Sequence, residues 1–149
     1  MPFKFSSLLV ILLIGSEALW GQPHLILDGT HQARPGYGTL LTLKFPRNGI
    51  KGVARFSHNL PEDWTVQALT RESSNTISQE GNKVRILWLS VPLIDTLRCS
   101  WFIKIPETAS GSFEINGKLN YFENGIQKEE KAEPFPIKIN KYYSRTIAQ

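Results

Sequence analysis

Short apolar runs, each closed by Gly, Pro, Asn or Asp, are the feature that most constrains the fold of this chain. Beyond residue 21, no stretch of ten or more residues carries the apolar repeat of an amphipathic helix. The runs instead predict about nine strands, and this pattern is typical of an all-β fold. We expect a single antiparallel β-sandwich, with a small β-barrel as the alternative. The predicted strands cover 24–28, 39–45, 52–57, 65–71, 83–90, 97–105, 112–123, 126–131 and 135–140.

Two Asn-Gly dipeptides lie close together in the second half of the chain. Asn124-Gly125 separates two strand-like runs, and both residues tolerate the positive φ of a type I′ turn, so this dipeptide predicts a β-hairpin. Asn116-Gly117 comes eight positions earlier and admits two interpretations, a second tight turn or a bulge within one long strand. The bulge is the preferred interpretation.

The N-terminal segment indicates export. Lys4 supplies a positive charge, residues 8–14 are an unbroken apolar run, and small residues follow. This is the order of a secretory signal peptide, and the run is far shorter than the ~20 apolar residues of a membrane-spanning helix. We expect residues 1–21 to be the signal peptide, with cleavage after Ala18 as the alternative to cleavage after Gly21. Residues 22–140 would form the sandwich and 141–149 a basic-aromatic tail, in the periplasm or at the cell surface.

Cys99 is the only cysteine, so the chain can form no internal disulfide. The apolar core must therefore stabilise the fold unaided. Cys99 lies in a strand-like run, which favours a buried, inert thiol over an intermolecular disulfide.

Composition and motifs argue against several function classes. The formal net charge is +4, but the basic residues are scattered along the chain, which does not predict nucleic-acid binding. There is no Gly-x-Ser-x-Gly and no phosphate-binding loop, so we do not expect an enzyme. His24, Asp28 and His31 lie close in sequence, but no fourth ligand is suggested and we expect solvated strand ends. We expect neither metal nor cofactor.

Three segments carry a resemblance to a known group. They are GVARF (52–56), KVRILWLSVP (83–92) and GSFEINGKLNY (111–121), followed by the second Asn-Gly pair. Over about residues 50–140 the chain resembles short exported proteins of Bacteroidota whose sandwich is similar to cohesin and immunoglobulin-like modules. The resemblance implies a bacterial envelope location and a non-catalytic, immunoglobulin/cohesin-like β-sandwich. It transfers no catalytic or calcium-binding residue.

Binding is the function class that remains, and four aromatic residues are its candidates. Tyr37 lies between two glycines in an expected loop, and Tyr142 and Tyr143 lie in the tail, where they would bind a ligand or hold the tail against the sandwich. Trp64 follows a loop but begins a strand, which favours the core. We expect an adaptor or accessory subunit that binds another envelope or secreted protein, for example in a surface or secretion machinery. The alternative is a carbohydrate-binding module that takes a polysaccharide.

Overall fold

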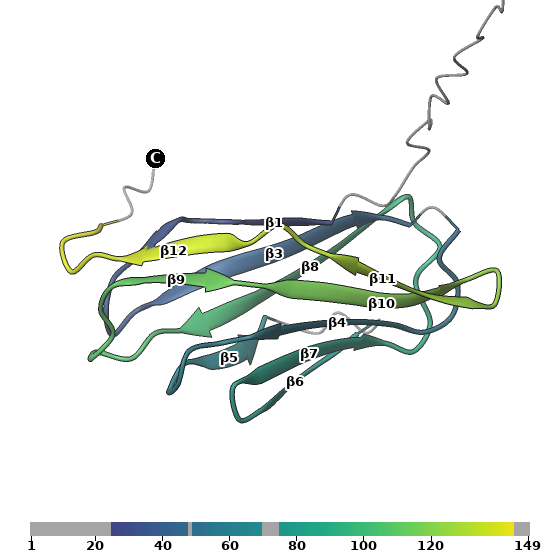
Figure 1. Cartoon of the computed structure of the whole chain (residues 1–149). Coiled ribbons are helices and arrows are strands. Elements are labelled where there is room, and N and C mark those ends of the chain that lie inside the picture. Colours follow the sequence, from purple (N-terminus) through teal and green to yellow (C-terminus); the bar gives the residue numbers. More distant parts are fainter. Residues whose placement is uncertain (1–24, 48, 70–74, 145–149) are drawn as a thin grey trace, which may run out of the picture.

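The computed structural model describes residues 25–47, 49–69 and 75–144, and the predicted signal peptide lies outside them. In these residues the chain is all-β (Figure 1). No helix there has the length and apolarity that crossing a bilayer requires. The strands are β1 (Ile26–Gly29), β2 (Gln32–Ala33), β3 (Gly38–Pro46), β4 (Ala54–Asn59), β5 (Thr65–Ala68), β6 (Thr76–Glu80), β7 (Lys83–Trp88), β8 (Thr96–Lys104), β9 (Ser112–Ile115), β10 (Gly117–Glu123), β11 (Ile126–Lys131) and β12 (Phe135–Ile139).

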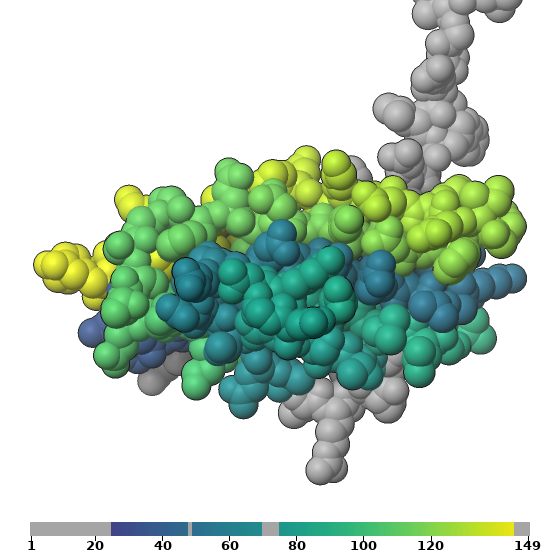
Figure 2. Space-filling view, turned by 60° about the horizontal axis from the view of Figure 1, so that its bottom comes forward, coloured from purple at the N-terminus to yellow at the C-terminus, as the bar shows by residue number. Residues whose placement is uncertain are grey.

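The described strands form three open sheets, so the predicted sandwich is confirmed and the small barrel is not formed by these residues. A four-stranded sheet has the order β1-β3-β8-β5, and a five-stranded sheet the order β11-β10-β4-β7-β6. The third sheet, β2-β12-β9, contains the one parallel pair, β2 with β12. In the space-filling view of Figure 2, β6 and β7 (teal) occupy the middle, with β10 and β11 (green to yellow-green) above them.

Strand alternation places the core between the sheets. On β3, Leu41, Leu43 and Phe45 are buried while the residues between them are partly exposed, and this strand pairs with β8 over nine residues. On β7 the buried set is Val84, Ile86 and Trp88, and on β8 it is Leu97, Cys99, Trp101 and Ile103. The burial of the Cys99 thiol agrees with its predicted inert role.

Aromatic pairs join one sheet to the other. Phe45 of β3 meets Trp88 of β7 edge-on, with ring centroids 5.6 Å apart. Phe56 of β4 packs on Trp101 of β8 at 6.0 Å. Such pairs add to the apolar area that they bury, which matters in a chain with no internal disulfide.

Asn116-Gly117 is neither a hairpin turn nor a bulge, which corrects both interpretations of this dipeptide. The chain changes sheets here, because β9 pairs with β12 whereas β10 pairs with β4 and β11. β9 and β10 follow one another in one direction (Figure 1). Gly117 lies under the Phe56 ring, and a Cβ atom added to it would lie 2.2 Å from Phe56 Cζ. Only glycine fits at this close approach.

The Asn124-Gly125 hairpin is confirmed. Asn124 and Gly125 have φ values of 52° and 76°, the positive pair that a type I′ turn needs. The turn joins β10 to β11, and the first cross-strand pair beside it is Glu123 with Ile126.

The side chain of Gln79 connects the edges of the two large sheets. It lies on β6, and its Oε1 accepts a hydrogen bond from the Val66 backbone N–H of β5 at 2.9 Å. Its Nε2 donates to the Trp64 carbonyl at 2.8 Å and to the Gly81 carbonyl at 3.0 Å. The amide thus offers β5 the donor and acceptor that a neighbouring strand would provide.

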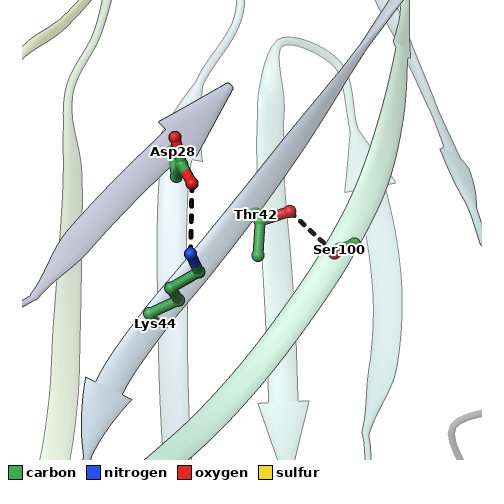
Figure 3. A network of polar contacts seen from close by, with 4 residues as sticks. All are labelled: Asp28, Thr42, Lys44 and Ser100. Atoms are coloured by element: carbon green, nitrogen blue, oxygen red, sulfur yellow. Dashed lines mark hydrogen bonds and ion pairs between the residues drawn. The ribbon is translucent and has the colours of Figure 1, made fainter. Parts of the chain in front are cut away.

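Polar contacts join three strands of the four-stranded sheet (Figure 3). Lys44 Nζ donates to Asp28 Oδ2 at 3.1 Å, and this hydrogen bond and charge lower the pKa of the Asp28 carboxyl. Thr42 and Ser100 share a hydrogen bond between their hydroxyls at 2.8 Å. These contacts link β1, β3 and β8 on the solvent side, where such pairs contribute little to stability.

Candidate functional site

Trp64, one of the four predicted binding residues, is not on the surface. Only 2% of it is exposed, and its ring packs edge-on against Phe113 of β9 with centroids 4.9 Å apart. It precedes β5, so its indole fills the space between the four-stranded sheet and β9. Trp64 is therefore a core residue, as its position at the start of a strand favoured, and it does not offer the exposed ring that a binding role needs.

The turn that carries Tyr37 lies at one end of the sandwich. The Tyr37 N–H donates to the Arg34 carbonyl at 3.2 Å, which closes the turn. The Gly36 N–H donates to the Ile105 carbonyl, and the Ile105 N–H donates to the Tyr37 carbonyl, so the turn is fixed to the loop after β8. The Tyr37 side chain is 59% exposed.

The turn after β12 carries Tyr142 to the same end. Asn140 caps it, since its side-chain oxygen accepts from the Tyr142 N–H at 3.0 Å and its carbonyl accepts from the Tyr143 N–H at 3.0 Å. The Asn140 N–H in turn donates to the Ala33 carbonyl just before the Tyr37 turn. The Tyr142 ring is 82% exposed, whereas Tyr143 is half-buried.

A groove of about 610 Å³ lies between these turns and the loop after β8. We call it the tyrosine groove. Tyr142 lines it directly, and Tyr37 belongs to the same turn as the lining residue Pro35. Other residues that line it include Glu107, Ser110, Asn140 and Lys141.

Each exposed tyrosine has a cation over its ring. The Arg34 guanidinium carbon lies 4.8 Å from the Tyr37 ring centroid, and Lys141 Nζ lies 5.0 Å from that of Tyr142. Cation–π contacts of this kind hold exposed rings in place with a modest energy of about 0.5–1 kcal/mol. These contacts favour one arrangement of each ring over the others.

Sequence reasoning identified the two tyrosines but missed the residues that complete the groove. Glu107 and Ser110 lie in a loop far from Tyr37 in sequence, and the pairing of β3 with β8, extended by the hydrogen bonds of Gly36 and Ile105, brings them together. The one local signal was Asn140, since an Asn that follows a strand is a common turn residue.

The described residues offer no group of three or more His, Cys, Asp or Glu side chains that could hold a metal ion. His24 lies outside them. His31 Nδ1 donates to the Pro136 carbonyl at 2.9 Å, and its ring stacks on Phe135 with centroids 4.4 Å apart. His31 therefore joins β2 to β12 in packing.

No protein-family model matches this chain, and no curated protein is similar to it. Solved structures do share its fold. A chain in the structure of manganese lipoxygenase of Gaeumannomyces graminis and part of zonadhesin of Komagataella pastoris is similar with a TM-score of 0.51 and 11% identity, over 78% of this chain and 48% of that one.

Two further solved structures are similar at lower scores. The GH20 exo-β-N-acetylglucosaminidase of Vibrio harveyi, in complex with N-acetylglucosamine, has a TM-score of 0.43 and 9% identity, over 81% of this chain and 18% of that one. A structure described as BspA_C_WT has a TM-score of 0.45 and 12% identity, over 78% of this chain and 50% of that one. This chain thus spans half or less of each. The first of the three similarities indicates a shared fold, and none of them carries a function to this chain.

Proposed function

We propose that this chain is an exported, non-catalytic binding module that attaches to another envelope or secreted protein as an adaptor or accessory subunit. The tyrosine groove is its binding surface. Export rests on the n-, h- and c-region order of residues 1–21. The sandwich supports the proposal because loops at the end of a rigid scaffold are the usual place for binding residues.

The observation that carries the proposal is the pair of exposed tyrosines at one end, each with a cation over its ring. Tyr37 and Tyr142 lie far apart in the sequence, yet their turns border one groove. Tyrosine and arginine are the residues most enriched among the energetic centres of protein interfaces. A ring fixed beforehand by Arg34 or Lys141 loses little conformational entropy when a partner covers it.

Site-specific cross-linking in the cells that make the protein would test this. A photo-reactive phenylalanine would replace Tyr142 in one version and Phe122 in another. Phe122 is an exposed aromatic of comparable size on β10, outside the groove. We expect a discrete adduct with one envelope or secreted protein from position 142 and none from position 122.

A second variant makes the outcome specific. Tyr37→Ala, in the version that carries the cross-linker at 142, should reduce the adduct at least about fivefold, because an interface tyrosine contributes 1 kcal/mol or more. If positions 122 and 142 captured the same proteins, or if Tyr37→Ala left the adduct unchanged, the groove would not be a protein-binding surface.

A polysaccharide is the second candidate ligand, and the polar lining of the groove favours it. Glu107, Ser110 and Asn140 place hydrogen-bonding groups beside the Tyr142 ring. A ring next to such groups suits a sugar, which offers an apolar face and several hydroxyls. Binding of a polysaccharide panel by the wild type, lost in Tyr142→Ala but kept in Phe122→Ala, would favour this candidate over a protein partner.

A further inference from the structure

A second concavity, of about 500 Å³, lies away from the tyrosine groove, where two sheets separate. β10 pairs with β4 from Gly117 onward, but the preceding strand β9 pairs with β12 instead. β4 continues to Asn59 without β10 beside it, which opens the hollow. We call it the lysine hollow. The polar residues that line it are Ser57, His58, Asn59, Lys83, Asn116, Lys118 and Lys131.

Three lysines from three strands meet at this hollow. Lys83 begins β7, Lys118 follows Gly117 on β10, and Lys131 ends β11. No carboxylate is among the described residues that line it. Lys118 has only a long ion pair, 3.9 Å to Glu129, and within the described residues Lys83 and Lys131 have none.

The register places two of these like charges directly opposite each other. Lys118 and Lys131 are cross-strand partners in the β10–β11 ladder, and Ser57 is the partner of Lys118 on the other side. A like-charge pair in this position destabilises a sheet. The long ion pair of Lys118 with Glu129 offsets only part of this repulsion. Glu80, the cross-strand partner of Lys83, forms its ion pair with Arg85 at 3.4 Å. The repulsion between the two lysines destabilises the folded protein, and a bound anion would reduce that repulsion.

We propose that the lysine hollow binds an oxyanion, phosphate or sulfate, with Lys83, Lys118 and Lys131 as its cationic ligands. Ser57, Asn59 and Asn116 supply neutral polar groups at the same surface. Lysine is a common point-charge ligand for phosphate. The hollow is larger than a single ion requires, so it accepts an oxyanion esterified to a small polar group such as a sugar. This site is separate from the tyrosine groove, and either proposal can fail without the other.

Thermal unfolding of the purified domain would test the site, with inorganic phosphate and sulfate compared against chloride at equal ionic strength. A ligand that binds only the folded state raises Tm with its concentration. We expect saturable stabilisation by phosphate or sulfate, with a Tm rise of about 5 °C at ten times Kd for a domain of this size. Chloride should give no such rise.

Three lysine variants locate the effect. Lys131→Gln and Lys83→Gln should each weaken binding about tenfold, since each loses a charged hydrogen bond. Without anion, Lys131→Gln should unfold at a higher temperature than the wild type, because it removes the opposed pair. Lys51→Gln is the control: it makes the same change in net charge at an exposed lysine outside the hollow. It should keep the wild-type affinity.

Glucose 6-phosphate, titrated beside inorganic phosphate, distinguishes the two sources of the anion. Equal affinity would indicate the free ion, and tighter binding of the ester a sugar-borne phosphate. Both results would support the site. It would be overturned if phosphate and sulfate acted no differently from chloride, or if Lys51→Gln lost as much affinity as the two hollow variants.

Discussion

The imidazole of His58 lies almost flat on the indole of Trp101, with ring centroids 5.4 Å apart and ring planes at 24°. His58 comes from β4 and Trp101 from β8, so this pair connects the two large sheets. Burial lowers the pKa of His58 to about 4, against the opposing effect of its hydrogen bond to the Asn59 carbonyl. The ring is therefore neutral at pH 7 in the folded protein.

We expect the domain to lose stability as the pH falls from about 6.5 to about 4. In this window the unfolded chain protonates His58, whose ordinary pKa is 6.5, while the folded state keeps it neutral. The unfolded state then binds more protons, so the free energy of unfolding falls as the pH falls, by roughly 3 kcal/mol in total. Urea unfolding at several pH values measures this slope.

Two histidine variants show whether His58 causes this pH dependence of the free energy of unfolding. His58→Phe keeps an aromatic ring against Trp101 and removes the titrating group, so the loss over this window should become much smaller. His31→Phe replaces an exposed histidine and should leave it unchanged. An unaltered slope in His58→Phe would mean that other groups cause the acid sensitivity.

Gly117→Ala should destabilise the domain by about 2 kcal/mol, because the new methyl group would collide with the Phe56 ring. Phe56→Leu in the same chain should reduce the penalty of the alanine, which a double-mutant cycle measures. Asn116→Ala, at the exposed neighbouring position, is the control and should change stability little. A penalty that Phe56→Leu did not reduce would contradict the collision as its cause.

Gln79→Ala should cost about 2 kcal/mol of the free energy of unfolding. It removes three hydrogen bonds and leaves the Val66 N–H and the Trp64 carbonyl without this partner. Gln127→Ala, at an exposed position of β11, should change stability by less than about 0.5 kcal/mol. Chemical denaturation measures both. If the two variants lowered the free energy of unfolding equally, the hydrogen bonds of the Gln79 amide would not contribute to stability.

Gly125→Ala should destabilise the β10–β11 hairpin by about 1–2 kcal/mol, since its φ of 76° places a Cβ atom against the backbone. Asn124→Gly should have little effect, because glycine adopts positive φ readily. Thermal unfolding of both variants checks the turn type. A neutral Gly125→Ala would be inconsistent with a type I′ turn.

The fold class could be predicted because the strongest signals are local. Alternation on β3, β7 and β8 and the Asn124-Gly125 turn each depend on a few adjacent residues. β2 and β6 were missed for the opposite reason. β2 has two residues and exists through its parallel pairing with β12, while β6 has one large apolar residue, Ile77, and is held by pairing with β7 and by Gln79.

The candidate surfaces were less predictable, because they depend on topology. A tyrosine between two glycines pointed to exposure at Tyr37, but nothing local placed it at the same end as Tyr142. The lysines looked scattered along the sequence, yet the strand register gathers Lys83, Lys118 and Lys131 at one hollow. The core position of Trp64 was easier to predict, because the start of a strand is a local signal that favours burial.

The passage of the chain from β9 into β10 also sets the distance along the backbone between the tyrosine groove and the lysine hollow. Ser112 follows the loop that borders the tyrosine groove, and Lys118 lines the lysine hollow six residues later on the same extended path. At about 3.3 Å per residue, this path is roughly 20 Å long. A single extended ligand that occupied both surfaces would need about that reach. Fragments shorter than this can occupy one surface or the other, but not both.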